Sequence, residues 1–82
     1  MKPNGRALFK ANCGVCHRLA DAGTTASVGP DLDNAQPPVA KVKLRVTDGG
    51  GVMPSFKGKL TAAQIDAVGH YVNGVSKGPP RN

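Results

Sequence analysis

The sequence has no tryptophan and only three other aromatic residues, one Tyr and two Phe, among its 82 residues. Aromatic side chains usually supply much of the buried area of a small core. Cysteine is also scarce, and two cysteines allow at most one disulfide bond. A domain of this size usually needs disulfides, a metal or a large bound group. The composition therefore indicates one small domain whose core would be completed by a bound apolar group.

Glutamate is absent, and five aspartates stand against eleven Lys and Arg, giving a formal net charge of +6. Such a surface attracts acidic partners or anionic surfaces. Nucleic acid is not favoured, because the basic residues are spread from Lys2 to Arg81 without an aromatic-interleaved run. No apolar run reaches 18 residues, so no membrane span is expected.

The start of the chain shows no secretory signal, because MKPNGR leads directly into an expected helix. Three origins fit this start: a cytosolic protein, a mature form from which a signal has been removed, or a domain of a longer chain. The use of the two cysteines decides among them.

The first part of the chain is expected to hold one helix and one long loop. Residues 4–13 place Gly5, Phe9 and Cys13 at a spacing of four, which is typical of one helix face. Residues 21–38 are rich in Pro, Gly, Ser, Thr, Asn and Asp, which is typical of a loop.

Residues 39–48 fit a helix and a strand equally well by their apolar periodicity. A helix beginning at Pro38 and ending in the glycines at 49–51 is favoured. The alternative hairpin would need residues 52–56 as its second strand, and Pro54 at their centre makes them a poor partner.

The last helix has the clearest signals. Thr61 and Gln64 match a capping box, and Leu60 with Ile65 matches a hydrophobic staple. The helix then carries an apolar stripe. Its members are Ile65, Val68, Val72 and Val75.

The motif CGVCH, from Cys13 to His17, contains both cysteines. A thioredoxin-type dithiol would need a βαβ unit, which the pattern lacks. A structural zinc site needs four ligands, and His70 is the only other histidine. A disulfide across two residues would stabilise little. Covalent haem attachment uses this spacing, because two thiols reach the vinyl groups while the next residue presents an imidazole to iron.

The rest of the chain resembles the small class I cytochromes c, in their compact bacterial or algal form, over about residues 4–76. The matching segments, in the family's order, are GRALFKANCGVCH, GPDL at 29–32, VAKVKLRVTDGGG, VMPSF at 52–56 and LTAAQIDAVGHYV. The resemblance implies an all-α fold of three to four short helices wrapped around one covalently attached haem c. We expect a single domain over 1–82, with 77–82 as a mobile tail.

The resemblance also assigns the haem ligands. Cys13 and Cys16 would bind the haem through two thioethers, while His17 and Met53 would be the axial iron ligands. The carbonyl of Pro30 would accept the imidazole N–H of His17, a contact that metal-bound histidines generally need. Without the resemblance, Met53 could equally be a gap-filling core residue and Pro30 an ordinary turn residue.

Other residues receive structural or peripheral roles. The pocket wall is assigned to Leu32, Val46 and Phe56. The crossing of the terminal helices is assigned to Gly5, Phe9 and Tyr71. His70 is expected at the surface. Arg45 is either a partner for a haem propionate or a solvated side chain, and both alternatives stay open.

The implied function is one-electron transfer by Fe(II)/Fe(III) cycling, without enzymatic activity. We expect a monomer that docks transiently on acidic-faced redox proteins through Lys10, Lys57 and Lys59. The expected location is the periplasm or an equivalent exported compartment. Two alternatives remain: the haem domain of a larger oxidoreductase, or a ligand-binding or peroxidase-like haem protein in which Met53 is easily displaced. Because the haem completes the core, the chain without it is expected to be largely unfolded.

Overall fold

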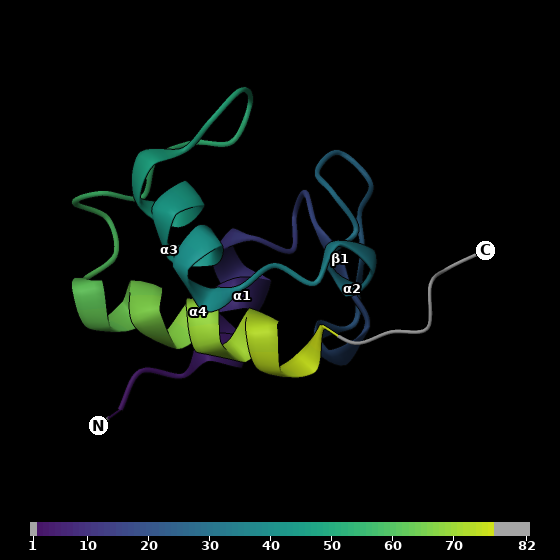
Figure 1. Ribbon diagram of the computed structural model, residues 1–82, viewed down its shortest axis with the longest axis horizontal. Helices are drawn as coiled ribbons and strands as arrows, with labels where there is room; N and C mark the ends of the chain where they lie inside the picture. Colours follow the sequence, from purple (N-terminus) through teal and green to yellow (C-terminus); the bar gives the residue numbers. More distant parts are fainter. Residues whose placement is uncertain (1, 77–82) are drawn as a thin grey trace.

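The computed structural model describes residues 2–76; the tail expected at 77–82 lies outside this range. Four helices dominate, as Figure 1 shows, so the expected all-α class is confirmed. A pair of two-residue strands is an addition that the sequence did not predict. The order is α1 (Gly5–Asn12), β1 (Arg18–Leu19), the 3₁₀ helix η1 (Ala20–Ala22), β2 (Thr24–Thr25), α2 (Leu32–Ala35), α3 (Val39–Asp48) and α4 (Ala62–Val75).

Helix α1 begins and ends close to the expected bounds. The Asn4 side chain accepts a hydrogen bond from the amide of Ala7 at 3.0 Å, which satisfies one of the free N–H groups of the first turn. The helix ends at Cys13, whose amide donates to the carbonyl of Phe9. The first cysteine of the motif therefore has its position fixed by a helix end.

The segment 21–38, expected to be only loop, contains β2 and α2. β1 and β2 pair antiparallel, with Leu19 opposite Thr24. α2 is a single turn capped by Asp31, whose side chain accepts from the amide of Asp33 at 3.0 Å. Elements of two and four residues leave little periodicity in a sequence, which is why the pattern missed them.

Helix α3 confirms the preference for a helix over residues 39–48. Pro38 is its N-cap and not its first helical residue, so that detail of the expectation was wrong by one position. The helix stops at Gly49, whose φ of 74° is disfavoured for residues with a side chain. The glycine run therefore ends the helix, as expected.

Helix α4 forms the expected capping box. The Thr61 hydroxyl accepts from the amide of Gln64 at 3.1 Å, and the Gln64 side chain accepts from the amide of Thr61 at 2.8 Å. Ile65, Val68 and Val72 are buried in the core, and Val75 is partly buried against it. The apolar stripe read from the sequence is therefore the face that α4 buries.

The terminal helices cross at the expected residues. A Cβ added to Gly5 would clash with the carbonyl oxygen of Ala67 and would lie 2.7 Å from Cβ of Tyr71. The rings of Phe9 and Tyr71 pack with centroids 6.1 Å apart and an interplanar angle of 54°. Gly5 therefore permits the close approach of α1 to α4.

Helix α4 makes the main helix–helix contacts of the fold. It packs against both α1 and α3, and in Figure 1 it runs below α3, with α1 behind it. The core is one apolar cluster to which α1, β1, η1, α3, α4 and the loop at Phe56 contribute; its largest fully buried members are Phe9, Leu19, Val68 and Val72. Within residues 2–76, no helix has the length and apolarity needed to cross a membrane.

Candidate functional site

The two cysteines lie in a tight turn that continues from α1. The amides of Cys16 and His17 both donate to the carbonyl of Cys13, at 3.1 and 3.0 Å. Both thiols are free, with Cys13 buried and Cys16 partly exposed. Burial raises the pKa of the Cys13 thiol to about 11, so the unmodified side chain is protonated at neutral pH. The structure thus contains no disulfide within this motif.

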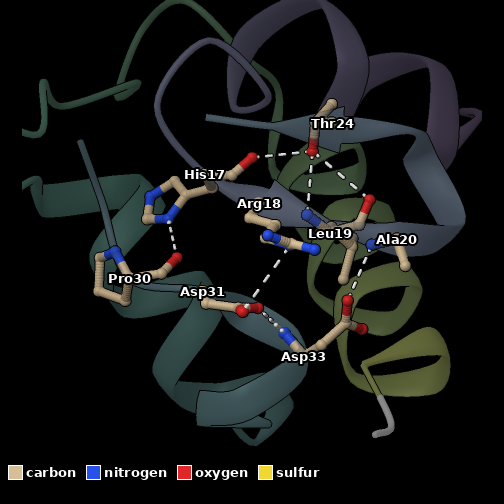
Figure 2. A network of polar contacts seen from close by, with 8 residues as sticks. All are labelled: His17, Arg18, Leu19, Ala20, Thr24, Pro30, Asp31 and Asp33. Carbon is tan, nitrogen blue, oxygen red and sulfur yellow. Dashed lines mark hydrogen bonds and ion pairs between the residues drawn. The ribbon is translucent and has the colours of Figure 1, made fainter. Parts of the chain in front are cut away.

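The imidazole of His17 points toward the Pro30 carbonyl, as Figure 2 shows, with 3.0 Å between Nδ1 and the oxygen. A carbonyl oxygen can only accept, so this contact requires the proton to be on Nδ1. The lone pair of a neutral imidazole is then on Nε2 and is available to a metal. The predicted contact between His17 and Pro30 is therefore formed.

The ring of His17 lies directly against the backbone of Gly29. A Cβ added to Gly29 would lie 2.6 Å from Cε1, 2.7 Å from Nδ1 and 3.0 Å from Nε2 of that ring. Only glycine leaves room for the imidazole at this position. Gly29 also donates its amide to the carbonyl of Cys16 at 2.7 Å. The Gly29–Pro30 pair thus holds the motif through both backbone and side chain.

Met53 is partly buried and packs against the core cluster. Its amide donates to the Gly50 carbonyl at 2.9 Å, and the amide of Gly50 donates to the Met53 carbonyl at 3.0 Å. Gly49 and Gly51 both have positive φ, 74° and 59°. The glycines before Met53 therefore shape a tight turn, in addition to ending α3.

The three residues predicted as pocket wall all belong to or pack on the core cluster. Val46 and Phe56 are buried, and the Phe56 amide donates to the Val46 carbonyl at 2.9 Å. Leu32 is partly buried at the start of α2. The bond between Val46 and Phe56 ties the end of the Met53 loop back to α3.

Arg45 and His70, which were given peripheral roles, are both exposed. The guanidinium of Arg45 lies against Gly50, beside the Met53 loop, since a Cβ on Gly50 would clash with it. His70 is exposed, as expected, and its Nε2 lies 3.5 Å from the Asp66 carboxylate. Lys43 lies 3.0 Å from the same carboxylate and holds the Asp66 pKa below its usual value through a hydrogen bond.

Sequence reasoning missed three polar residues near the motif. Asp33 is buried and accepts a hydrogen bond from the Ala20 amide. The Thr24 hydroxyl donates to the carbonyl of His17, and Asp21 accepts from the hydroxyl of Tyr71. The Asp-x-Asp pattern at 31–33 was an available signal for a helix cap. No local signal identified the partners of Thr24 and Asp21.

The donor set fits a covalently bound haem better than the alternatives. Two free thiols precede an imidazole whose Nε2 is available, and a thioether lies in a glycine-shaped turn. Within residues 2–76, no three His, Cys, Asp or Glu side chains are grouped so as to hold a metal ion.

Comparisons with known proteins agree with this reading. Residues 2–72 match the family model described as cytochrome C oxidase, cbb3-type, subunit III. A cytochrome c6 of Microcystis aeruginosa is 34% identical over 73 residues, covering 84% of this chain and 90% of the relative.

Solved structures agree as well. The c-type cytochrome SorU of Sinorhizobium meliloti has a TM-score of 0.78 at 35% identity, covering 94% of this chain and 97% of that one. Cytochrome c6C of Synechococcus sp. PCC 7002 has a TM-score of 0.70 at 30% identity, covering 89% and 94%. These matches favour the carrier over the alternative functions. The chain belongs to the small class I cytochromes c, binds one haem c covalently and acts as a one-electron carrier.

Proposed function

We propose that Cys13, Cys16, His17 and Met53 hold the haem of this carrier. When bound, the haem supplies an Fe(II)/Fe(III) couple. The observation that supports the assignment most directly is the contact between Nδ1 of His17 and the Pro30 carbonyl, because it leaves Nε2 as the free donor atom. Cys13 lies one turn before His17 and Cys16 lies directly before it, and their thiols would form the thioethers.

The protein's own groups set the balance between the two iron states. The Pro30 carbonyl makes the imidazole of His17 a stronger donor by accepting its N–H. The thioether of Met53 is a soft, neutral ligand, which favours ferrous iron and raises the reduction potential. If His17 and Met53 both bind the iron, the haem would have no open position for a substrate. We therefore infer that the protein is not an enzyme.

The Met53→Ala variant tests the ligand assignment. We expect it to lose the iron–thioether absorption band of the ferric protein and to bind carbon monoxide readily in the ferrous form. Val52→Ala is the matched control, because the adjacent Val52 side chain is 87% exposed. Ready binding of carbon monoxide by the unaltered protein at neutral pH would contradict a firmly ligated Met53 and support the ligand-binding alternative.

Docking on acidic-faced redox partners is proposed from the charges near the site. Lys10, Lys57 and Lys59 are exposed, and none is ion-paired within the part of the chain that the structure describes. Lys10 lies in the last turn of α1, while Lys57 and Lys59 follow the Met53 loop. Such docking is fast, small in area and weakened by salt.

Three exposed valines flank the residues that are proposed to hold the haem. Val15 lies between the two cysteines, Val28 precedes the Gly29–Pro30 pair, and Val52 precedes Met53. Apolar side chains next to a charged surface suit a transient contact that must exclude water briefly.

We infer a monomer that exchanges electrons during short encounters. It would work in the periplasm or an equivalent exported compartment, where haem is attached to the CxxCH motif.

A further inference from the structure

Asp33 is a carboxylate buried next to the haem motif. It is only 3% exposed, and its Oδ2 accepts a hydrogen bond from the amide of Ala20 at 2.8 Å. Aspartate is rarely buried, since removing a charge from water is costly unless hydrogen bonds compensate. The hydrogen bond to Ala20 compensates for this cost, so the contact is part of the folded structure around the motif.

The contact closes a ring of interactions that contains His17. Ala20 lies three residues after His17, and Asp33 lies three residues after Pro30. Two hydrogen bonds therefore join these chain segments, one between Ala20 and Asp33 and one between His17 and Pro30, and the ion pair of Arg18 with Asp31 at 4.0 Å lies between them. Figure 2 shows both bonds linking the segment after the motif to the segment that begins α2.

Each segment of this ring is also stiffened locally. On one side, the Thr24 hydroxyl donates to the carbonyl of His17 at 2.8 Å and accepts from the amide of Leu19 at 3.0 Å. On the other side, Asp31 caps the turn by accepting from the amide of Asp33 at 3.0 Å. The Gly29–Cys16 hydrogen bond lies on the other side of the His17–Pro30 contact, and the Arg18–Asp31 ion pair is long and partly exposed. The bond between Ala20 and Asp33 is therefore the buried contact that holds the start of α2, and with it the Pro30 carbonyl, against the segment of His17.

We propose that Asp33 is a positioning residue for the iron ligand His17, acting through the Pro30 carbonyl. The inference rests on the proposed role of His17 as a ligand. Loss of the Asp33 contact lets the Pro30 carbonyl move away from Nδ1, which makes the imidazole a weaker donor. A weaker donor stabilises ferric iron less, so the reduction potential becomes more positive, and the plane of the imidazole becomes less well fixed.

Three variants of the haem-loaded protein separate the contact from the charge. Asp33→Ala removes both. Asp33→Asn removes the charge and keeps an oxygen that can accept from Ala20. Ala20→Pro removes the donor and keeps the carboxylate. Ala20 suits proline, because it opens η1 and the preceding Leu19 is extended, with φ −154° and ψ 113°.

The readouts are the reduction potential and the electron paramagnetic resonance spectrum of the ferric protein, which is sensitive to the orientation of the axial imidazole. We expect altered spectra and more positive potentials for Asp33→Ala and Ala20→Pro. We expect an unaltered spectrum for Asp33→Asn. In Asp33→Ala, the Ala20 amide should exchange with solvent about tenfold faster, as fits one lost hydrogen bond.

Thr61→Ala is the control for general loss of stability, because it removes the cap of α4 away from the ring. The proposal is overturned if folded Ala20→Pro keeps the spectrum and potential of the unaltered protein. It is also overturned if Asp33→Asn or Thr61→Ala alters the spectrum as much as Asp33→Ala does. Should Asp33→Ala not fold, the other two ring variants decide. An unaltered protein without a His–Met spectrum would instead refute the proposed function.

Discussion

The hydroxyl of Tyr71 donates a 2.6 Å hydrogen bond to the carboxylate of Asp21. Tyr71 lies in α4 and Asp21 in η1, while Arg6 of α1 lies 3.7 Å from the same carboxylate. One aspartate therefore links both terminal helices to the segment that follows the haem motif. Burial raises the pKa of Tyr71 to about 12, with further contributions from the hydrogen bond and the negative charge of Asp21.

This link predicts a pH dependence of stability. The pKa of Tyr71 is higher in the folded protein than its ordinary value of 10.0, so its contribution is complete below about pH 10 and is lost toward pH 12. Tyr71→Phe should lower the free energy of unfolding by about 1 kcal/mol at neutral pH. It should also lose less stability than the unaltered protein between about pH 10 and 12. Urea unfolding across this range measures both, and parallel curves for the two proteins would count against the link.

The crossing of α1 and α4 predicts a large effect of a single methyl group. Gly5→Ala should reduce the free energy of unfolding by about 1–3 kcal/mol, because the added Cβ would clash with Ala67 and Tyr71. Gly74→Ala is the matched control within α4, where an added Cβ meets no atom within 4 Å. It should stabilise the protein by about 0.5–1 kcal/mol. Thermal or urea unfolding checks both, and equal effects of the two changes would argue against a close crossing.

The contact of Gly29 with the imidazole predicts a spectral change. Gly29→Ala should displace the His17 ring, since the new Cβ would lie 2.6 Å from Cε1. We expect an altered spectrum of the ferric protein and a loss of about 1–3 kcal/mol in stability. Gly23→Ala provides the comparison, because the backbone of Gly23 also disfavours a side chain (φ is 72°) but no atom lies within 4 Å of an added Cβ. It should cost about 1–2 kcal/mol through backbone strain alone and leave the spectrum unaltered.

The proposed docking surface predicts a salt-dependent rate. Replacing Lys57 and Lys59 together by Gln should slow electron transfer with an acidic redox protein several-fold at low ionic strength, because electrostatic steering is reduced. The difference should vanish in high salt. Replacing Lys2 and Lys41 by Gln changes the net charge equally and is the control. Stopped-flow kinetics measures the rates; equal effects of the two pairs would show that only net charge matters.

The apolar deficit of the chain predicts that haem is needed for folding. The double variant Cys13→Ser with Cys16→Ser, prepared without haem, should show little of the helical circular dichroism of the loaded protein. The reason is that a chain of 82 residues with three aromatic side chains has little area to bury. A cooperative thermal transition with native helix content in this variant would refute the prediction.

The sequence predicted the helices whose apolar pattern extends over several turns or whose start is marked by capping residues. α3 and α4 were both expected near their observed bounds, because ten or more residues give a readable apolar stripe and Thr61 with Gln64 marks a beginning. β1, β2 and α2 were not expected, because two to four residues carry no period. Their geometry comes from tertiary contacts, such as that of Thr24 with His17.

The candidate site also contains residues that the sequence predicted and a residue that it could not predict. The motif CGVCH by itself indicates covalent haem attachment. The pairing of His17 with Pro30 followed from the family resemblance. The buried Asp33 could not be predicted, since an aspartate in a polar loop looks solvated until its partner is known. Its partner is a backbone amide, and backbone donors carry no residue-specific signal in a sequence.

The contact between Gly5 of α1 and Tyr71 of α4 closes a loop that contains every residue between these two positions. Every proposed haem-holding residue, from Cys13 to Met53, belongs to that loop. The entropy lost in closing a flexible loop grows only logarithmically, by about 0.6 kcal/mol for each doubling of its length. The spacing between His17 and Met53 can therefore change by insertion or deletion at little cost to the closure. The crossing of the terminal helices would then tolerate loops of different length between α1 and α4.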